Sequence, residues 1–439
     1  MFQPIREHVV HPDHWREFAK YLSFLEEETP LREEGAAKLI LPRTARDLLR
    51  SRVGAEVIDE FKITKPIYQA IRKVPQWDRE SAPFYTITHS SHGEMTIGDL
   101  RVRGHAGPYE DEPVEATVEH YWERLAAGNA DFWYGAGVVG SVFQDRSLVF
   151  NVDDIPSLLD QFVEGEGITS KTSFIGVWGS TFPWHSEDMR LWSANALLYG
   201  APKYWYVLPA SQSQKLEELA DAYAYESANC THYMMHKRSQ ICPSFLSRRG
   251  FTPRTTVHTQ GEIMVVAPNA YHMGFNLGLN IAESKNFATH SWIKDGMEAK
   301  ACSCRGRARA GAVFDMGPFS ELKPPRDLYQ PSTVVKSRPL CTICSATTDY
   351  AACDPSLEQE LLCAACRARE HRRKNQPKVC QVCEFKETRS NKRRFHTVGG
   401  GHVCHNCECT RRKAHKSRYF LLFTFVICYI KLSDESKCL

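Results

Sequence analysis

The stretch Phe182-Pro-Trp-His185-Ser-Glu187-Asp-Met-Arg-Leu-Trp-Ser-Ala-Asn195, with the distant pair Tyr271-His272, decides how this chain is organised. An imidazole and a carboxylate two residues apart, with a second imidazole far downstream, form a ligand set that holds ferrous iron and leaves three coordination positions open. A spacing of two suits a strand, because alternate residues point to the same side. We therefore interpret His185, Glu187 and His272 as iron ligands.

Short strands surround these residues between positions 173 and 291. Apolar or alternating runs bounded by turn residues predict strands at 174–178, 203–208, 261–266 and 286–292. Several short strands of this kind indicate a sandwich or a barrel. His185 and Glu187 would end one strand and His272 would come from a strand across the barrel. A helical pattern at 214–224 is expected to be an insertion between strands.

The region before the barrel mixes helices and strands. One helical face is apolar at Trp15, Phe18, Tyr21, Leu22 and Leu25. Residues 35–42 have the pattern of a short strand closed by a proline. Residues 47–130 form a mixed α/β connecting region, in which the pattern at 115–125 predicts a helix. We expect the first segment, 5–46, to cap the main core.

Composition and charge divide the chain. Its 439 residues, 42% of them apolar, can bury a large core and suggest more than one domain. The 16 cysteines cluster mostly after Cys302 and no secretory leader opens the chain, which favours metal binding in a reducing compartment. Residues 1–366 carry 37 Lys and Arg against 46 acids, whereas residues 367–418 carry 16 against four. This asymmetry predicts a tail that faces a polyanion, or a solvated tail without a specific partner.

Two cysteine quartets follow the linker at 306–339. They are Cys341, Cys344, Cys363 and Cys366, then Cys380, Cys383, Cys404 and Cys407. Tandem Cys-x2-Cys pairs, separated by eighteen and by twenty residues, predict zinc at 340–418. The basic residues after each quartet favour contacts with DNA phosphates. An interleaved finger that reads a histone tail is the alternative, drawing on Cys353, His371, His396, His402 or Cys409. The hydrophobic tail at 419–439 has an apolar run of about twelve residues, 419–430, whereas a membrane span needs roughly 20, and the tail receives no role.

The order of several motifs is similar to that of a known family. It runs through Tyr134, Thr181-Phe-Pro-Trp-His-Ser-Glu-Asp-Met, Asn195, Gly200-Ala-Pro-Lys203-Tyr-Trp205, Tyr271-His-Met-Gly-Phe-Asn and Asn280-Ile-Ala-Glu-Ser-Lys-Asn-Phe-Ala-Thr. This order resembles the Jumonji-C (JmjC) dioxygenases, and more closely the histone lysine demethylases that also carry a Jumonji-N (JmjN) segment, which residues 5–46 resemble. Residues 361–369 resemble the second knuckle of GATA-type fingers, although the usual tryptophan is missing.

The resemblance implies a fold that is mainly β with α insertions. Residues 131–305 would form a double-stranded β-helix, of the jelly-roll or cupin-like kind, with a JmjN cap and a small C-terminal zinc-finger module. Fe(II), O2 and the co-substrate 2-oxoglutarate would bind in the barrel. Lys203 and Tyr134 would hold the far carboxylate, Asn195 the near one, and Phe182 and Trp205 would be the walls. A structural zinc would be held by Cys230, His236, Cys302 and Cys304.

The substrate pocket departs from the resembled enzymes. Phe174 and Thr172 stand where tyrosines usually line the methylammonium cage. Lys285, between Ser284 and Asn286, replaces a small or hydroxyl residue and would bring a cation near a cationic substrate, which is costly in a low-dielectric pocket. The resemblance implies a nuclear enzyme acting on the histone H3 tail of nucleosomes, methylated at lysine 9 or lysine 36. A chromatin-binding reader with a weakened pocket and a JmjC protein hydroxylase are the alternatives.

Overall fold

The structure is a computed structural model that describes part of the chain. The described residues are 2–10, 18–52, 58–74, 83–104, 107–128, 130–143, 151–163, 168–223, 230, 232–302, 304, 310–322, 395–398 and 401–404. The chain separates into two units, Met1–Val335 and Lys336–Leu439. In the second unit the described part is one antiparallel hairpin, β18 (Phe395–Val398) and β19 (Gly401–Cys404). The predicted zinc ligation of the two quartets and the hydrophobic tail at 419–439 lie outside the described residues.

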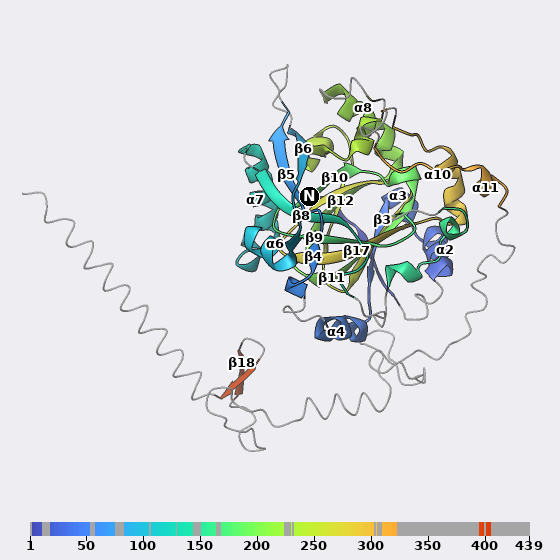
Figure 1. Cartoon of the computed structure of the whole chain (residues 1–439). Coiled ribbons are helices and arrows are strands. Elements are labelled where there is room, and N and C mark those ends of the chain that lie inside the picture. The colour runs from blue at the N-terminus through green and yellow to red at the C-terminus, as the bar shows by residue number, and fades with distance from the viewer. Residues whose placement is uncertain are drawn as a thin grey trace, which may run out of the picture. The chain divides into compact units, whose positions relative to one another are not determined.

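Two large sheets form the body of the first unit (Figure 1). The smaller sheet has, in spatial order, β1 (Gln3–Pro4), β14 (Arg254–His258), β12 (Lys203–Leu208), β16 (Tyr271–Asn276) and β10 (Thr181–His185). The larger has β13 (Ser239–Ile241), β6 (Phe84–Ser91), β5 (Ile67–Lys73), β8 (Ala130–Val139), β9 (Thr172–Gly176), β17 (Asn280–Phe287), β11 (Trp192–Gly200), β15 (Glu262–Val266), β3 (Ala36–Ile40) and β2 (Arg6–Val9). A short pair, β4 (Lys62–Ile63) and β7 (Met95–Thr96), stands apart. The sheets fit the expected jelly-roll-like β fold.

Helices flank the strands, with α6 and α7 on one side and α2, α10 and α11 on the other (Figure 1). The α-helices are α2 (Phe18–Glu28), α3 (Leu31–Glu34), α4 (Arg43–Arg52), α6 (Ile97–Arg103), α7 (Val114–Ala126), α8 (Ser213–Tyr223), α9 (Pro243–Arg248), α10 (Ile293–Met297) and α11 (Gly317–Ser320). The 3-10 turns are η1 (Pro108–Glu110), η2 (Val152–Asp154), η3 (Leu158–Gln161), η4 (Asp188–Arg190), η5 (Ala210–Gln212), η7 (Tyr233–His236) and η8 (His290–Trp292). Within the described residues, no helix has the length and apolarity that crossing a membrane requires.

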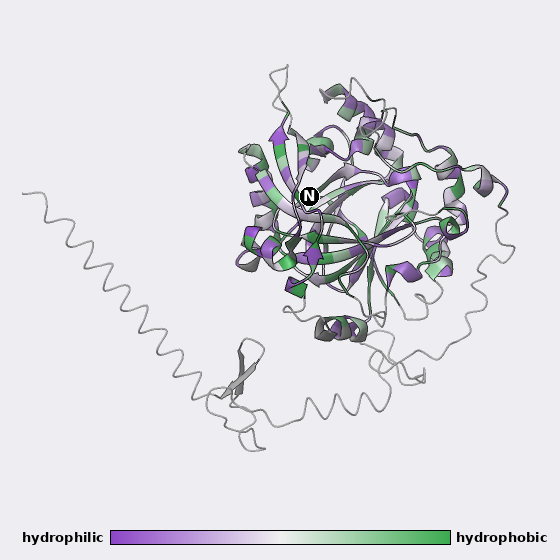
Figure 2. Cartoon of the chain, in the orientation of Figure 1, coloured by the Kyte–Doolittle hydropathy of each residue, from purple (hydrophilic) through white to green (hydrophobic). Residues whose placement is uncertain are grey.

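The burial of the strands explains their composition. All five residues of β15 and all six of β16 are buried, because these strands lie in the interior of their sheets. Figure 2 shows hydrophobic residues among the strands and hydrophilic residues on the flanking helices. Helix α2 buries Phe18, Tyr21, Leu22 and Leu25, which confirms the predicted apolar stripe at these four positions. Trp15, the fifth, lies outside the described residues.

Most of the predicted helices and strands are present in the structure. One predicted strand ends earlier than expected. Strands β12 and β15 and helices α7 and α8 lie within a residue or two of their expected bounds. The strand predicted at 286–292 instead forms the end of β17, which stops at Phe287, followed by η8. Its pairing with β11 ends where Phe287 faces Trp192, so the chain beyond has no strand partner among the described residues. Trp292 is then buried in the core as part of a 3-10 turn.

Candidate active site

The predicted iron ligands lie together. One donor atom from each of His185, Glu187 and His272 lies within 4.8 Å of the others. His272 Nε2 is 3.6 Å from Glu187 Oε1, and the two imidazole centroids are 4.2 Å apart. This arrangement of two imidazoles and one carboxylate on one side of a point can hold Fe(II) with open positions on the other.

The strands that carry the three residues are arranged differently from the prediction. His272 does not come from a strand across the barrel, because β10 and β16 are neighbours in the smaller sheet and His185 pairs directly with His272. Glu187 lies beyond the end of β10, at the start of η4. The turn that follows places Met189 and Arg190 at φ values of 52° and 53°, a left-handed conformation that non-glycine residues adopt at a cost.

Hydrogen bonds orient both imidazoles for metal binding. His185 Nδ1 donates to the Pro183 carbonyl at 2.7 Å, which leaves Nε2 without its proton and able to bind a metal. Burial, with the nearby His272 and Lys237, lowers the pKa of His185 well below its usual value. Burial pulls the pKa of Glu187 upward, but the interactions with His272 and Lys237, together with hydrogen bonds from Asn286 and Ser193, outweigh it and the pKa is lowered. Neutral imidazoles and an ionised carboxylate are the forms that ligate metals.

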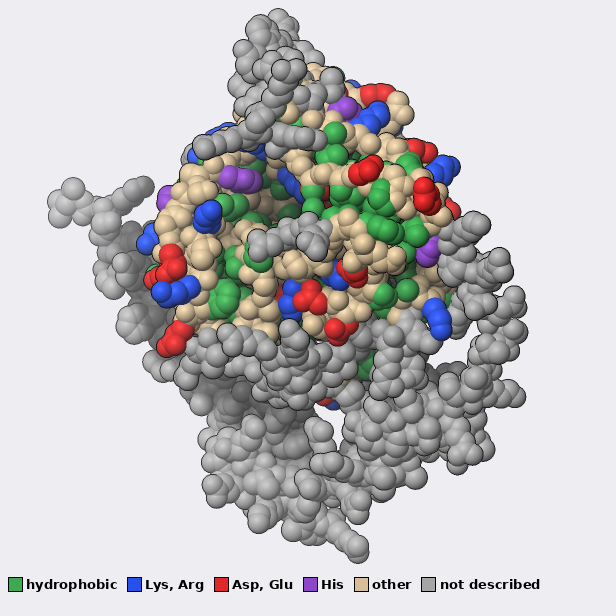
Figure 3. All heavy atoms as spheres, turned by 45° about the vertical axis from the view of Figure 1, so that its right-hand side comes forward, with side chains coloured by type: hydrophobic (Ala, Val, Ile, Leu, Met, Phe, Trp, Pro, Cys, Tyr) green, Lys and Arg blue, Asp and Glu red, His purple; other side chains and the backbone are tan. Residues whose placement is uncertain are grey.

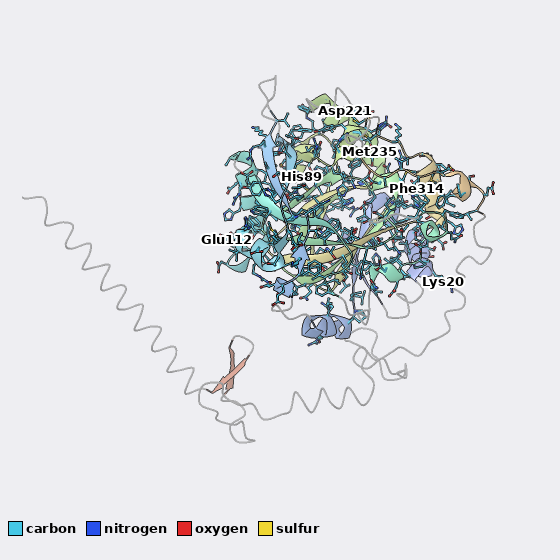
Figure 4. All side chains as sticks on the ribbon, in the orientation of Figure 1. Lys20, His89, Glu112, Asp221, Met235 and Phe314 are labelled. Atoms are coloured by element: carbon cyan, nitrogen blue, oxygen red, sulfur yellow. The ribbon has the colours of Figure 1, made fainter. Side chains whose placement is uncertain are left out.

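A cavity of about 440 Å³ opens onto these ligands, with more apolar than polar lining. Figure 3 shows a hollow in one face of the molecule, with hydrophobic, basic and histidine side chains around it. Strand β6 contributes His89 to the lining, a residue labelled in Figure 4. Gln69 fixes the start of β10, because its side-chain amide exchanges two hydrogen bonds with the backbone of Thr181, both at 2.8 Å.

The residues expected to bind the co-substrate line the same cavity. Lys203 is 2% exposed, and its Nζ donates to Asn276 Oδ1 at 2.6 Å. Burial lowers the pKa of Lys203 to about 7. Tyr134 lines the cavity at its β8 wall, and burial raises its pKa. Phe182 and Trp205 pack against each other with centroids 4.6 Å apart.

Two buried polar atoms test whether this end of the cavity fits 2-oxoglutarate. Asn195 Oδ1 and Trp205 Nε1 are buried without a hydrogen-bond partner among the described residues, and both side chains line the cavity. Buried polar atoms are normally satisfied, so a ligand that supplies the partner is expected. The buried Lys203, whose pKa is lowered by desolvation, gains its charged form when an anion binds beside it. A dicarboxylate with a keto oxygen supplies acceptors for the Trp205 indole N–H and for the Lys203 ammonium, whereas the Asn195 amide oxygen is itself an acceptor and needs a donor.

The expected substrate residues divide into two groups. Thr172, Phe174, Ser284 and Asn286 line the cavity. Lys285 does not line it in the described structure, so the expectation that it brings a cation into the pocket is wrong. Side chains alternate along β17, and Lys285 Nζ instead donates to the carbonyls of Asp153 and Ile155 on the far face of the strand, both at 3.1 Å.

Lys237 lines the cavity beside the iron ligands, and the sequence did not single it out. Its Nζ is 3.5 Å from Asp188 Oδ1, and its backbone has a φ of 52°. Burial lowers its pKa, but Asp188 and Glu187 raise it more, so the ammonium is retained. In sequence Lys237 stands next to a second histidine in a polar segment, and nothing distinguishes it from a surface lysine.

A second cluster of donors lies near η7, whose Met235 is labelled in Figure 4. Cys230, His236, Cys302 and Cys304 offer donor atoms within 4.8 Å of one another. Cys302 Sγ is 3.5 Å from both Cys230 Sγ and His236 Nε2. Ligands of a tetrahedral zinc lie about 3.6–3.8 Å apart, so the cluster fits a closed structural zinc.

Comparisons with known proteins agree with this geometry. Residues 172–287 match the family described as JmjC domain, hydroxylase. The chain is 32% identical over 321 residues to the human protein named probable lysine-specific demethylase 4F, covering 71% of this chain and 48% of that relative. It is 31% identical to rat lysine-specific demethylase 4D over 74% of this chain and 61% of the relative, and to mouse lysine-specific demethylase 4B over 67% and 26%.

The chain spans between 26% and 61% of the length of these curated relatives. The matched segment contains all three candidate iron ligands, His185, Glu187 and His272. It also contains Ser284 and Asn286, the two residues of β17 that line the cavity. The match therefore covers β9 to β17, which carry the candidate iron ligands, but not the cavity walls on β5, β6 and β8. Residues 172–287 are thus similar to JmjC domains, and the chain that carries them is similar to lysine-specific demethylases.

Proposed function

We propose that the protein is an Fe(II)- and 2-oxoglutarate-dependent histone lysine demethylase. The observation that carries the proposal is that His185, Glu187 and His272 line the same cavity as a buried lysine. This lysine is Lys203, whose charged form an anionic ligand would stabilise. The relatives are named as lysine-specific demethylases, which supports a methylated lysine as substrate. We infer the tail of histone H3, di- or trimethylated at lysine 9 or lysine 36, as the substrate in a nuclear setting.

Iron, O2 and 2-oxoglutarate would supply the oxidation of a methyl C–H bond, and the hydroxymethylamine product would release formaldehyde. The chain's own task is to position the reactants. Lys203 and Tyr134 bind the far carboxylate of the co-substrate and Asn195 the near one, while Phe182 and Trp205 exclude water from that end. At the other end Ser284 and Asn286 orient the methylated nitrogen toward the iron ligands.

The finer assignments rest on sequence. We propose that residues 5–46 act as a JmjN-type cap, supported by the packing of β3 on β15 and of α2 in the main core. We propose zinc in the Cys230 cluster and in the two cysteine quartets at 340–418. The quartets and their basic flanks would tether the enzyme to nucleosomal DNA or to a histone tail.

A JmjC protein hydroxylase is the second candidate. The substrate end of the cavity is apolar at Val139, Ile168 and Phe174, and lacks the phenol that would contact methyl groups at position 174. The reader hypothesis is weakened, because its main support was a lysine in the pocket and Lys285 points away from it.

The test uses the full chain with Fe(II), 2-oxoglutarate and histone H3 peptides trimethylated at lysine 9 or at lysine 36. Mass spectrometry of the peptides should show stepwise loss of methyl groups, and the faster peptide identifies the site. His185→Ala should abolish the loss. Retention of all methyl groups on both peptides, with peptides hydroxylated instead, would exclude the demethylase and favour the hydroxylase.

A further inference from the structure

The strand β17 carries two sets of side chains. Ser284 and Asn286 line the cavity, and alternation places Glu283 and Lys285 on the opposite face. Glu283 is 1% exposed and Lys285 is 4% exposed. Charged groups at this depth are retained only when hydrogen bonds or opposite charges compensate their desolvation. The partners of Glu283 and Lys285 therefore show which other parts of the chain are bound to this face of β17.

The ammonium of Lys285 holds the segment 151–155. Its Nζ donates to the carbonyl oxygens of Asp153 and Ile155, each at 3.1 Å. Turn η2 covers Val152–Asp154, and its own hydrogen bonds use the carbonyls of Asn151 and Val152. The two carbonyls that Lys285 binds are therefore ones that the turn itself does not use.

The carboxylate of Glu283 contacts one residue near each end of the segment between β8 and β9. Ser141 Oγ donates to one of its oxygens, and Lys171 Nζ lies 2.9 Å from the other. Lys171 Nζ also donates to Asn151 Oδ1 at 3.0 Å, which links this contact to the turn that Lys285 binds. One strand face thus contacts residues 141, 151–155 and 171 through a continuous polar network.

These contacts surround the crossover that leads from β8 to β9. The crossover leaves β8 after Val139 and enters β9 at Thr172, and both residues line the cavity, as does Ile168 within it. Thr172 pairs with Ser284, so the residue that follows the crossover lies beside the inner face of the same strand. Ile168 of the crossover and the strand residues that flank it, Val139 and Thr172, form part of the cavity wall, and the outer face of β17 contacts the crossover near both ends.

We propose that Glu283 and Lys285 are positioning residues that clamp the described parts of the crossover, residues 140–143, 151–155 and 168–171, to β17 and thereby set the wall of the cavity at Val139, Ile168 and Thr172. Their hydrogen bonds and ion pairs in the described structure go to this crossover and not to the iron ligands or the co-substrate residues. The proposal rests on the proposed function only in assigning that wall to the peptide substrate.

Hydrogen–deuterium exchange of the full chain tests the clamp without requiring turnover. Lys285→Met keeps the length and apolar stem of the side chain but removes its donors, so two buried carbonyls lose their partner. Exchange in residues 151–163 should become about tenfold faster or more, while β10 and β16 keep their protection. Lys285→Arg restores donors and should return exchange toward wild type. Lys294→Met, at an exposed lysine on α10, is the matched control.

Steady-state kinetics then connect the clamp to the cavity. Lys285→Met should raise the Michaelis constant for a methylated peptide severalfold and leave the Michaelis constant for the co-substrate unchanged, because the co-substrate residues lie on other strands. Unchanged exchange in 151–163, or equally faster exchange in β10 and β16, would overturn the clamp. If no preparation shows turnover, the proposed function fails while the exchange result still decides for or against the clamp.

Discussion

At the scale of single residues, Lys203 shows how burial prepares a side chain for a ligand. It sits in β12 with 2% exposure, and its one hydrogen bond among the described residues goes to a neutral amide oxygen. Burial therefore disfavours the ammonium and lowers the pKa to about 7. An incoming carboxylate reverses this balance, because an opposite charge at close range favours the charged form.

The first prediction concerns this linkage. Above about pH 7 the free protein holds Lys203 neutral, whereas the complex with 2-oxoglutarate requires the ammonium, so binding takes up a proton. The apparent Kd should be nearly flat below pH 7 and rise about tenfold per pH unit above it. Calorimetry in buffers of different ionisation enthalpy measures the proton uptake.

Lys203→Met is the control for this prediction. It should bind 2-oxoglutarate weakly at every pH and take up no proton, since the titrating group is gone. A wild-type Kd that does not change between about pH 6 and 9 would show that Lys203 is not the group that senses the co-substrate.

The residues of the site were easier to predict than their arrangement. The residue types at positions 185, 187 and 272 were enough to predict that these three side chains lie close together, as they do in the structure. Which strands would be neighbours could not be read from spacing, and β10 and β16 turned out to pair directly. Lys285 was misplaced because motif comparison ignores the alternation of a strand, which puts it opposite Ser284 and Asn286.

At the scale of elements, the Cys230 cluster joins parts of the chain that are distant in sequence. It brings η7 into contact with Cys302 and Cys304, more than sixty residues later in the sequence. The weak sequence signal, two separated pairs of donors, became specific only through the family resemblance. The end of β17 was misjudged for a related reason, since strand ends depend on the length of the partner strand.

The second prediction is that this cluster binds one structural zinc. Cys302→Ser should lower the zinc content by one equivalent per chain and the Tm by about 5 °C or more, because structural zinc contributes directly to folding free energy. Elemental analysis and thermal denaturation measure the two effects. Cys242→Ser is the matched control, since Cys242 lies outside the cluster and contacts Ser244. Equal zinc in both variants would contradict the assignment.

At the scale of the whole molecule, the chain combines an acidic body with a basic C-terminal region. Residues 367–418 carry 16 basic residues against four acids, and the body to residue 366 carries an excess of acids. The two large sheets and the site belong to Met1–Val335, while most of the basic region lies outside the described residues. For that region the sequence remains the source of the functional hypothesis.

The third prediction is that the basic region binds DNA mainly through phosphates. The affinity of the full chain for duplex DNA should fall linearly on a plot of log K against log salt concentration. Replacing the five basic residues after the second quartet by glutamine should reduce the slope by up to about 4.5; these are Arg411, Arg412, Lys413, Lys416 and Arg418. Salt-insensitive or absent binding would refute this role and favour a finger that reads a histone tail.

The central claim is that the triad and the co-substrate residues together demethylate lysine. The most direct measurement is the ratio of formaldehyde released to succinate formed by the full chain with Fe(II), 2-oxoglutarate and a trimethylated histone H3 peptide, against a His272→Ala background. We predict a ratio of about one, because each methyl group removed consumes one co-substrate. Succinate without formaldehyde, or neither product above the His272→Ala background, would contradict the account.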